Sequence, residues 1–331
     1  MRRGPTKVSA RVLARTLACL VVAVASQIYA QISPATLAQA NSALQNGQAD
    51  KAIALLAPLS STGVGAAEAQ NLLCRVRFML EQWSQAAAEC QQAINLDGQN
   101  SDYHMWLGRV LGQQASHASF LSAYGIAKHS LSEMQTAVKL NPRNGPAMSD
   151  LGDYYAQAPG IAGGGTDKAQ AIASQLDKVD SARAHKLRGD IALAQKDDTT
   201  AENEYRQAAN VATEPADYWT VLAEFYRKHQ RWSDLDAAIQ SCVSAAARNK
   251  NSGVGLYDGS GVLIAANRNM ALAAQMLENY LSGTTLTEDG PAFIAHIRLS
   301  RLKQKLGDAA GAKGELAIAA QMAKEFNPAQ A

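Results

Sequence analysis

Aromatic residues are scarce in this sequence of 331 residues. Only 6% of the residues are Phe, Trp or Tyr, although 47% are apolar, so alanine supplies much of the apolar content. Alanine is the best helix former and one of the smallest core residues. This composition indicates closely packed helices, and it favours an elongated array of repeats over a chain with a single central core.

Sustained runs of basic residues are also missing. The whole chain has a formal net charge of +2, with 31 basic and 29 acidic residues. Without the first thirty residues the net charge becomes −3, because that segment has five basic residues and no acidic one: Arg2, Arg3, Lys7, Arg11 and Arg15. Nucleic-acid binding requires a basic patch. We therefore expect no nucleic-acid partner.

The apolar run near the N-terminus is too short to cross a membrane. Leu17 to Ala25 forms a run of about ten apolar residues, whereas a transmembrane helix needs roughly twenty. A basic segment precedes this run and small residues follow it, a pattern typical of a secretory signal peptide. We predict that residues 1–30 are a signal peptide, cleaved after Ala30 or after Ala25. The mature protein should be periplasmic or secreted, without a permanent membrane anchor.

Motifs for catalysis or metal binding are absent as well. The six histidines have no metal-ligand spacing, and Ser260 lacks the second flanking glycine position of a nucleophile elbow. The glycines from Gly160 to Gly165 precede Thr166 and Asp167, where a phosphate loop would have Lys and then Ser or Thr. We therefore predict no catalytic residues, no metal, no cofactor and no enzymatic activity.

The sequence does contain a segment that recurs at about 34-residue spacing. Copies of one half of the unit are Gly47 to Leu56, Glu81 to Ala93 and Ala137 to Asn144. Copies of the other half are Trp106 to Gly108, Leu151 to Tyr155 and Trp219 to Tyr226. These segments resemble the tetratricopeptide repeat, in which large residues and a small residue line the first helix, and a small residue lies where the second helix crosses it.

The resemblance implies an all-α fold, an α–α superhelix of about eight helical hairpins. We expect six units over residues 33–249, and two weaker units with a C-terminal cap over residues 252–331. The units begin near Ser33, Ala67, Ser101, Gly145, Ala182, Ala216, Ser252 and Phe293. Prolines at loop-like intervals, such as Pro58, Pro142 and Pro215, argue against an alanine-rich coiled coil.

Two units are longer than the repeat. The third has about ten extra residues between Gln113 and His129. The fourth has the Gly-rich segment from Ala158 to Lys168, which cannot continue a helix and is predicted to be an enlarged interhelical loop. We expect Thr166 or Asp167 to cap the next helix. An anion bound at the start of that helix is the alternative role.

Cysteines are few in the mature sequence. Cys74 and Cys90 fall on the inner faces of the two predicted helices of the second unit, and disulfides persist in exported proteins. We predict a Cys74–Cys90 bridge, which closes a loop of about 15 residues and contributes about 3 kcal/mol. Two small buried thiols are the alternative. Cys242 is left over and should be buried.

The first helices of such an array line its concave face, which is the usual binding surface. Helical spacing places a polar stripe there: Asn71, Arg75, Met105, Arg109, Gln113, Ser149, Asp153 and Gln157, with Phe78 beside them and Arg183, Lys186, Asp190, Thr220, Glu224 and Arg227 farther along. This mixed lining predicts a protein or peptide partner, and hence a scaffold or adaptor. The alternative for each residue is an ordinary solvated helix face.

Two further hypotheses concern the ligand. Arg75 and Arg109 occupy equivalent places on consecutive first helices, so they should share an anion, either Asp153 or a ligand carboxylate. Some tetratricopeptide proteins bind a terminal carboxylate through Lys and Asn, but Leu37 replaces the first Lys here, although Asn41 matches.

The alternative function is a small-ligand or glycan recognition subunit, in which Tyr103, Trp106 and Tyr124 would bind sugars.

Overall fold

The computed structural model describes residues 33–59, 63–249, 254–283 and 286–327, and the predicted signal peptide lies outside them. The described residues form sixteen α-helices and two short 3-10 helices, without a strand. The prediction of an all-α fold with about eight hairpins is confirmed. The hairpins are α2 (Pro34–Gln45) with α3 (Ala49–Leu56), α4 (Ala66–Met79) with α5 (Trp83–Leu96), α6 (Ser101–His117) with α7 (Phe120–Leu140), α8 (Gly145–Gln157) with α9 (Thr166–Leu176), α10 (Ser181–Ala194) with α11 (Asp198–Val211), α12 (Pro215–Lys228) with α13 (Trp232–Arg248), α14 (Gly255–Ala265) with α15 (Met270–Leu281), and α16 (Ala292–Lys305) with α17 (Ala309–Met322).

Glycines allow the close contacts between these helices. A Cβ atom added to Gly189 of α10 would lie 2.3 Å from the Tyr205 ring of α11, and one added to Gly108 of α6 would lie 2.8 Å from Met134 Cγ of α7. Helices approach this closely only where a side chain is missing. The small residues of the repeat therefore set the distance within a hairpin.

The two unusually long units touch each other. The extra residues of the third unit lengthen both of its helices, so that α7 reaches the 3-10 helix Gly160–Ala162 in the Gly-rich loop. The Tyr154 hydroxyl lies 3.0 Å from the carbonyl oxygen of Ala127 and 2.9 Å from that of Ala162. The expected cap is wrong, because α9 begins at Thr166 and its N-cap is Gly165, without a capping side chain.

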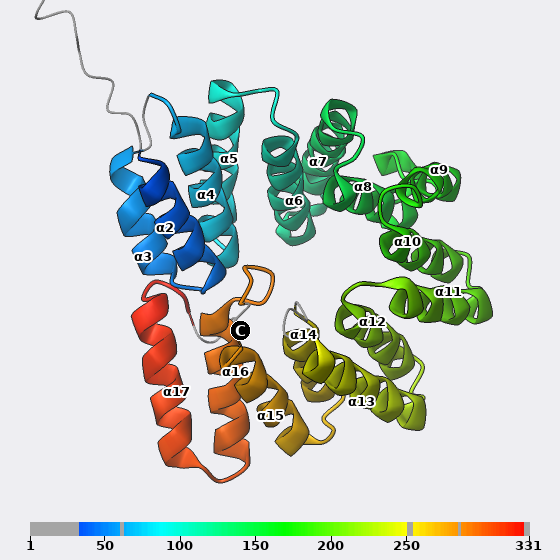
Figure 1. Cartoon of the computed structure of the whole chain (residues 1–331). Helices are drawn as coiled ribbons and strands as arrows, with labels where there is room; N and C mark the ends of the chain where they lie inside the picture. Colours follow the sequence, from blue (N-terminus) through cyan, green and yellow to red (C-terminus); the bar gives the residue numbers. More distant parts are fainter. Residues whose placement is uncertain (1–32, 60–62, 250–253, 284–285, 328–331) are drawn as a thin grey trace, which may run out of the picture.

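The array closes into a ring, in which the first and last hairpins are in contact (Figure 1). The backbone N–H of Lys324, just after α17, donates to the Asp50 carboxylate of α3 at 3.2 Å. Gly47 faces α16 so closely that a Cβ atom there would lie 2.6 Å from the Ala292 nitrogen. One hydrophobic cluster includes buried side chains from both ends of the chain, such as Leu44 and Phe293.

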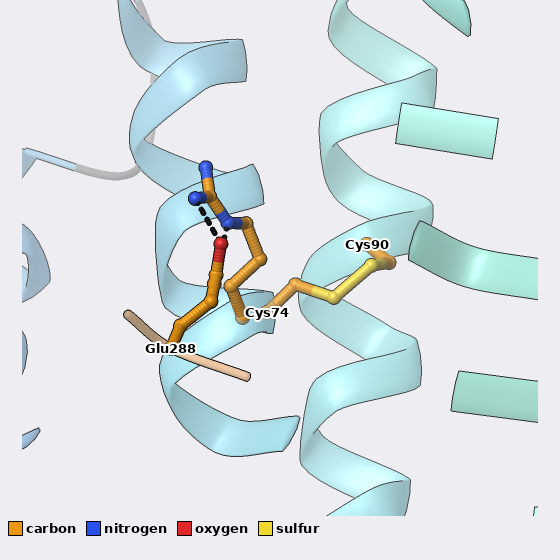
Figure 2. The surroundings of a disulfide bond; sticks show 4 residues. Cys74, Cys90 and Glu288 are labelled. Carbon is orange, nitrogen blue, oxygen red and sulfur yellow. Dashed lines mark hydrogen bonds and ion pairs between the residues drawn. A yellow bond between two sulfur atoms is a disulfide. The ribbon is translucent and has the colours of Figure 1, made fainter. Parts of the chain in front are cut away.

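A disulfide joins Cys74 of α4 to Cys90 of α5, the pair that the sequence predicts (Figure 2). The two Cα atoms are 5.1 Å apart, within the range that a disulfide spans. The bridge fastens the two helices of the second hairpin together, directly beside Arg75. Cys242 is free and buried, and burial raises the pKa of its thiol to about 12.

Two glycine substitutions test the packing of the hairpins. Gly189→Ala should lower the free energy of unfolding by about 1 to 3 kcal/mol, because the new methyl group overlaps the Tyr205 ring. Gly125→Ala is the matched control, since this glycine also lies inside a helix but has no atom within 4 Å of the added Cβ. Gly125→Ala should stabilise the protein by about 0.5 to 1 kcal/mol. Equal effects in thermal unfolding would contradict the proposed packing.

The disulfide is tested by thiol labelling. Protein from the native host, unfolded without reductant, should be labelled at Cys242 alone. Reduction should lower the free energy of unfolding by about 3 kcal/mol, because the unfolded chain regains the freedom of the closed loop. Labelling of all three mature cysteines before reduction would show that the bridge does not form.

Candidate functional site

The first helices of the hairpins face the inside of the ring (Figure 1). Their side chains line four adjoining cavities, which together form one inner groove. We name the cavities after one lining residue each. The Gln113 cavity has a volume of about 560 Å³, the Glu288 cavity about 220 Å³, the Glu224 cavity about 570 Å³ and the Lys305 cavity about 360 Å³.

Shared lining residues show that the cavities adjoin one another. The Gln113 and Glu288 cavities share Phe78, Trp106 and Asp289. Tyr257 lines both the Glu288 and Glu224 cavities, and Arg298 lines both the Glu224 and Lys305 cavities. The inner groove thus extends over α4, α6 and α8 at one end and over α10, α12, α14 and α16 at the other.

Five of the eight residues predicted for the concave face line the groove. They are Arg109, Gln113, Asp153 and Gln157 in the Gln113 cavity, and Arg75 in the Glu288 cavity. Farther along, the predicted residues Asp190, Thr220, Glu224 and Arg227 line the Glu224 cavity.

The other three predicted residues are buried. The exposed fractions of Asn71, Met105 and Ser149 are 4%, 6% and 7%, and none of these residues lines any of the four cavities. Each lies one helical turn before a groove residue of the same helix, at a level covered by neighbouring helices. The open stripe is therefore shorter along each helix than the sequence predicts.

Arg75 and Arg109 do come together, but each has its own carboxylate partner. Arg75 Nε donates to Glu288 Oε2 at 2.9 Å, and Arg109 Nε donates to Asp150 Oδ2 at 2.5 Å. Their guanidinium carbons lie 5.5 and 4.8 Å from the centre of the Trp106 ring, so both make cation–π contacts with it.

Asp153 is not the shared anion that the sequence suggests. Its carboxylate pairs with Lys186 Nζ at 2.8 Å, and the same ammonium pairs with Asp190, also at 2.8 Å. Burial raises the pKa of Asp153 to about 6, although Lys186 acts in the opposite direction. Asp150 lies one turn earlier on α8 and reaches Arg109 instead.

Sequence reasoning missed the loop between α15 and α16. Glu288 enters the groove from this loop and lies against α4, as Figure 2 shows beside the disulfide. The loop is fixed to the first hairpin because the Glu288 N–H donates to Gln45 Oε1 at 3.2 Å. The only sequence signal is the polar segment Thr287 to Gly290 between two helices, which does not indicate a contact more than 200 positions away.

The aromatic residues of the glycan hypothesis do not form one surface. Tyr103 and Trp106 are only 8% and 6% exposed, while Tyr124 on α7 is 43% exposed and lines none of the four cavities. The sugar-stacking platform that the sequence suggests is therefore not assembled among the described residues.

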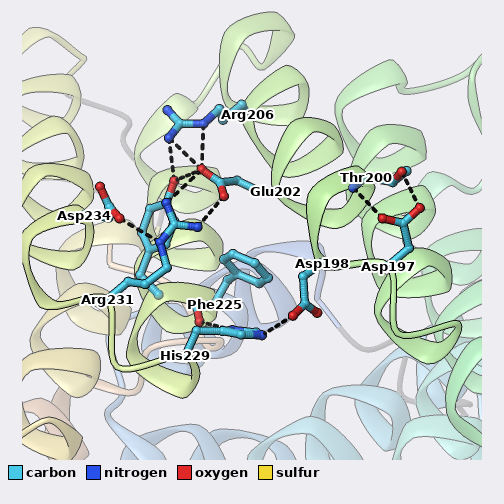
Figure 3. Close-up of polar contacts among 10 residues, drawn as sticks. Asp197, Asp198, Thr200, Glu202, Arg206, Phe225, His229, Arg231 and Asp234 are labelled. Atoms are coloured by element: carbon cyan, nitrogen blue, oxygen red, sulfur yellow. Dashed lines mark hydrogen bonds and ion pairs between the residues drawn. The ribbon is translucent and has the colours of Figure 1, made fainter.

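A second charged cluster, outside the groove, is satisfied within the protein (Figure 3). Glu202 accepts hydrogen bonds from Arg206, Arg231 and Tyr226, at 2.9, 2.5 and 2.8 Å. Burial acts to raise the pKa of Glu202, but these hydrogen bonds outweigh it and lower the pKa to about 2. The cluster joins α11 to α12 and to the start of α13, which is a structural role.

The described part of the chain offers no group of His, Cys, Asp and Glu side chains that could hold a metal ion. None of the helices in it is both long enough and apolar enough to cross a membrane.

No protein-family model matches the chain, and no curated protein is similar to it in sequence. Solved structures with similar helical arrays include a thermophilic tetratricopeptide-repeat protein of Thermus thermophilus, which is 20% identical, with 55% of this chain and 93% of that chain covered and a TM-score of 0.47. A tetratricopeptide-repeat protein of Parabacteroides merdae is 11% identical, with coverage of 86% and 97% and a TM-score of 0.47. PilF of Pseudomonas aeruginosa is 13% identical, with coverage of 76% and 97% and a TM-score of 0.41.

Because these similarities are weak, the chain's own hairpins carry the assignment. They repeat the paired antiparallel helices of the tetratricopeptide unit, eight times in succession. Glycine lies against a neighbouring helix in several of the first helices: Gly108 and Gly189 face the second helix of their own hairpin, and Gly152 faces Leu187 of the next hairpin. In architecture, the chain is an all-α array of eight helical hairpins that resembles the tetratricopeptide-repeat fold.

Proposed function

We propose that this protein binds an extended segment of another protein, or a peptide, in the inner groove and acts as a scaffold or adaptor. One observation carries the proposal. Gln113 and Gln157 face the Gln113 cavity, and their side-chain amides make no hydrogen bond with other described residues. An extended peptide exposes a backbone N–H and C=O at every residue, and amide side chains can pair with both.

The shape of the groove supports the same proposal. Four adjoining cavities, three of which have aromatic residues in their lining, offer successive sites for the side chains of one extended segment, rather than a single enclosed site for a small molecule. We propose that residues 33–249 and 252–331 act as one binding body, because both parts contribute lining residues. Binding of this kind requires no cofactor and no catalytic residue.

For its location, we propose the periplasm or the secreted fraction. The predicted signal peptide supports export, and the Cys74–Cys90 disulfide is compatible with an oxidising compartment. A protein that binds partners there would belong to the cell envelope. We propose neither a nucleic-acid partner nor a permanent membrane anchor.

Site-specific photocrosslinking tests the binding surface. A photoreactive amino acid at position 113 should crosslink to a protein or peptide partner in an envelope extract. The same amino acid at position 207 should not, because Gln207 is exposed on the second helix α11 and lines no cavity. Equal crosslinking at both positions, or only at position 207, would contradict binding in the groove.

A further inference from the structure

Charge is unevenly distributed along the inner groove. The lining of the Gln113 cavity has three carboxylates, from Asp150, Asp153 and Asp289, and one cation, Arg109, while Lys186 outside the lining pairs with Asp153. The Glu288 cavity also has three carboxylates against one cation, with Arg75 facing Glu81, Glu288 and Asp289. The described lining of this end of the groove is therefore acidic.

The opposite end of the groove is basic. The Glu224 cavity is balanced, because it has three acidic and three basic lining residues. The described lining of the Lys305 cavity includes Arg298, Arg301 and Lys305 and no acidic residue. The charge of the lining thus changes from negative at α6 and α8 to positive at the end of α16.

The arginines at the acidic end are already neutralised. Glu288 pairs with Arg75, and Asp150 pairs with Arg109. Both guanidinium groups also make cation–π contacts with the Trp106 ring. A ligand carboxylate would have to displace one of these carboxylates and would meet the remaining acidic residues. An anionic group is therefore disfavoured at the position where the sequence suggests one.

Two acidic residues of the lining at this end remain for a ligand. Neither Glu81 nor Asp289 makes a side-chain hydrogen bond or ion pair with another described residue. Asp289 is the more exposed of the two, and its backbone N–H donates to Thr287 Oγ1 at 3.2 Å. It lines both the Gln113 and Glu288 cavities, beside the Phe78 ring. A cationic side chain there would meet a carboxylate and an aromatic wall together.

We propose that the groove selects a segment with separated charges, which places a Lys or Arg side chain beside Asp289 and an acidic group in the Lys305 cavity. This inference rests on the proposed function, since it specifies which peptides the groove binds. Charge complementarity at both ends favours such a segment over a neutral one and over one with a single kind of charge. The neutral middle of the groove separates the two sites.

Selection from a displayed library of random 12-residue peptides tests the proposal, with the mature protein, residues 31–331, immobilised. The enriched peptides should have Lys or Arg separated from Asp or Glu, and their binding should weaken as salt concentration rises. For one enriched peptide, Asp289→Asn should reduce affinity about fivefold, as expected for one exposed charge pair. Asp167→Asn is the matched control, because Asp167 lies outside all four cavities, and it should leave affinity unchanged.

A charge exchange distinguishes a direct contact from a change in the fold. Asp289→Lys should abolish binding of the selected peptide. The same variant should bind a second peptide, in which the basic residue is replaced by Glu. Circular dichroism checks that each variant is folded. Enriched peptides without basic residues, or affinity unchanged by Asp289→Asn, would overturn the charge preference and leave peptide binding intact. Failure to enrich any peptide, together with no crosslink at position 113, would overturn the proposed function itself.

Discussion

The contact between the first and last hairpins is the constraint on which the inner groove depends. Through this contact, the loop before α16 reaches α4 and places Glu288 against Arg75. The same contact positions Asp289 between two cavities. In an array with separated ends, the concave face would lack both carboxylates, and Arg75 would be available to an anion. Ring closure therefore sets both the shape and the charge of the groove.

Neutralisation of the arginines changes what the concave face can bind. The positions of Arg75 and Arg109 suggest an anion site, but their carboxylate partners remove it. Each guanidinium also contacts Trp106. A ligand carboxylate that displaced Glu288 or Asp150 would therefore gain little free energy of binding. The polar groups that remain for a ligand at this end of the groove include the amides of Gln113 and Gln157 and the carboxylates of Glu81 and Asp289.

Local sequence patterns were sufficient for the hairpins and for part of the groove. Glycine and alanine at helix crossings, together with the spacing of the repeat, predict the helix pairs. Spacing alone predicts that Arg109, Gln113, Asp153 and Gln157 lie on the concave face, and all four line the Gln113 cavity. Ring closure could not be predicted, because the small rotations between neighbouring hairpins accumulate over the whole array. Glu288 and Asp289 were missed for that reason. Asn71, Met105 and Ser149 were predicted to be open but are buried, because a helical stripe in the sequence does not show how deeply the neighbouring helices cover it.

The distance between the two ends of the array tests this account most directly. Spin labels at Lys51→Cys on α3 and Gln321→Cys on α17 occupy exposed positions on adjacent helices, and the native Cys242 is buried. Pulsed electron spin resonance on the mature protein should give one short and narrow distance distribution, as a closed ring requires. A broad distribution centred at long distances would show that the ends are separated in solution, and would contradict the groove described above.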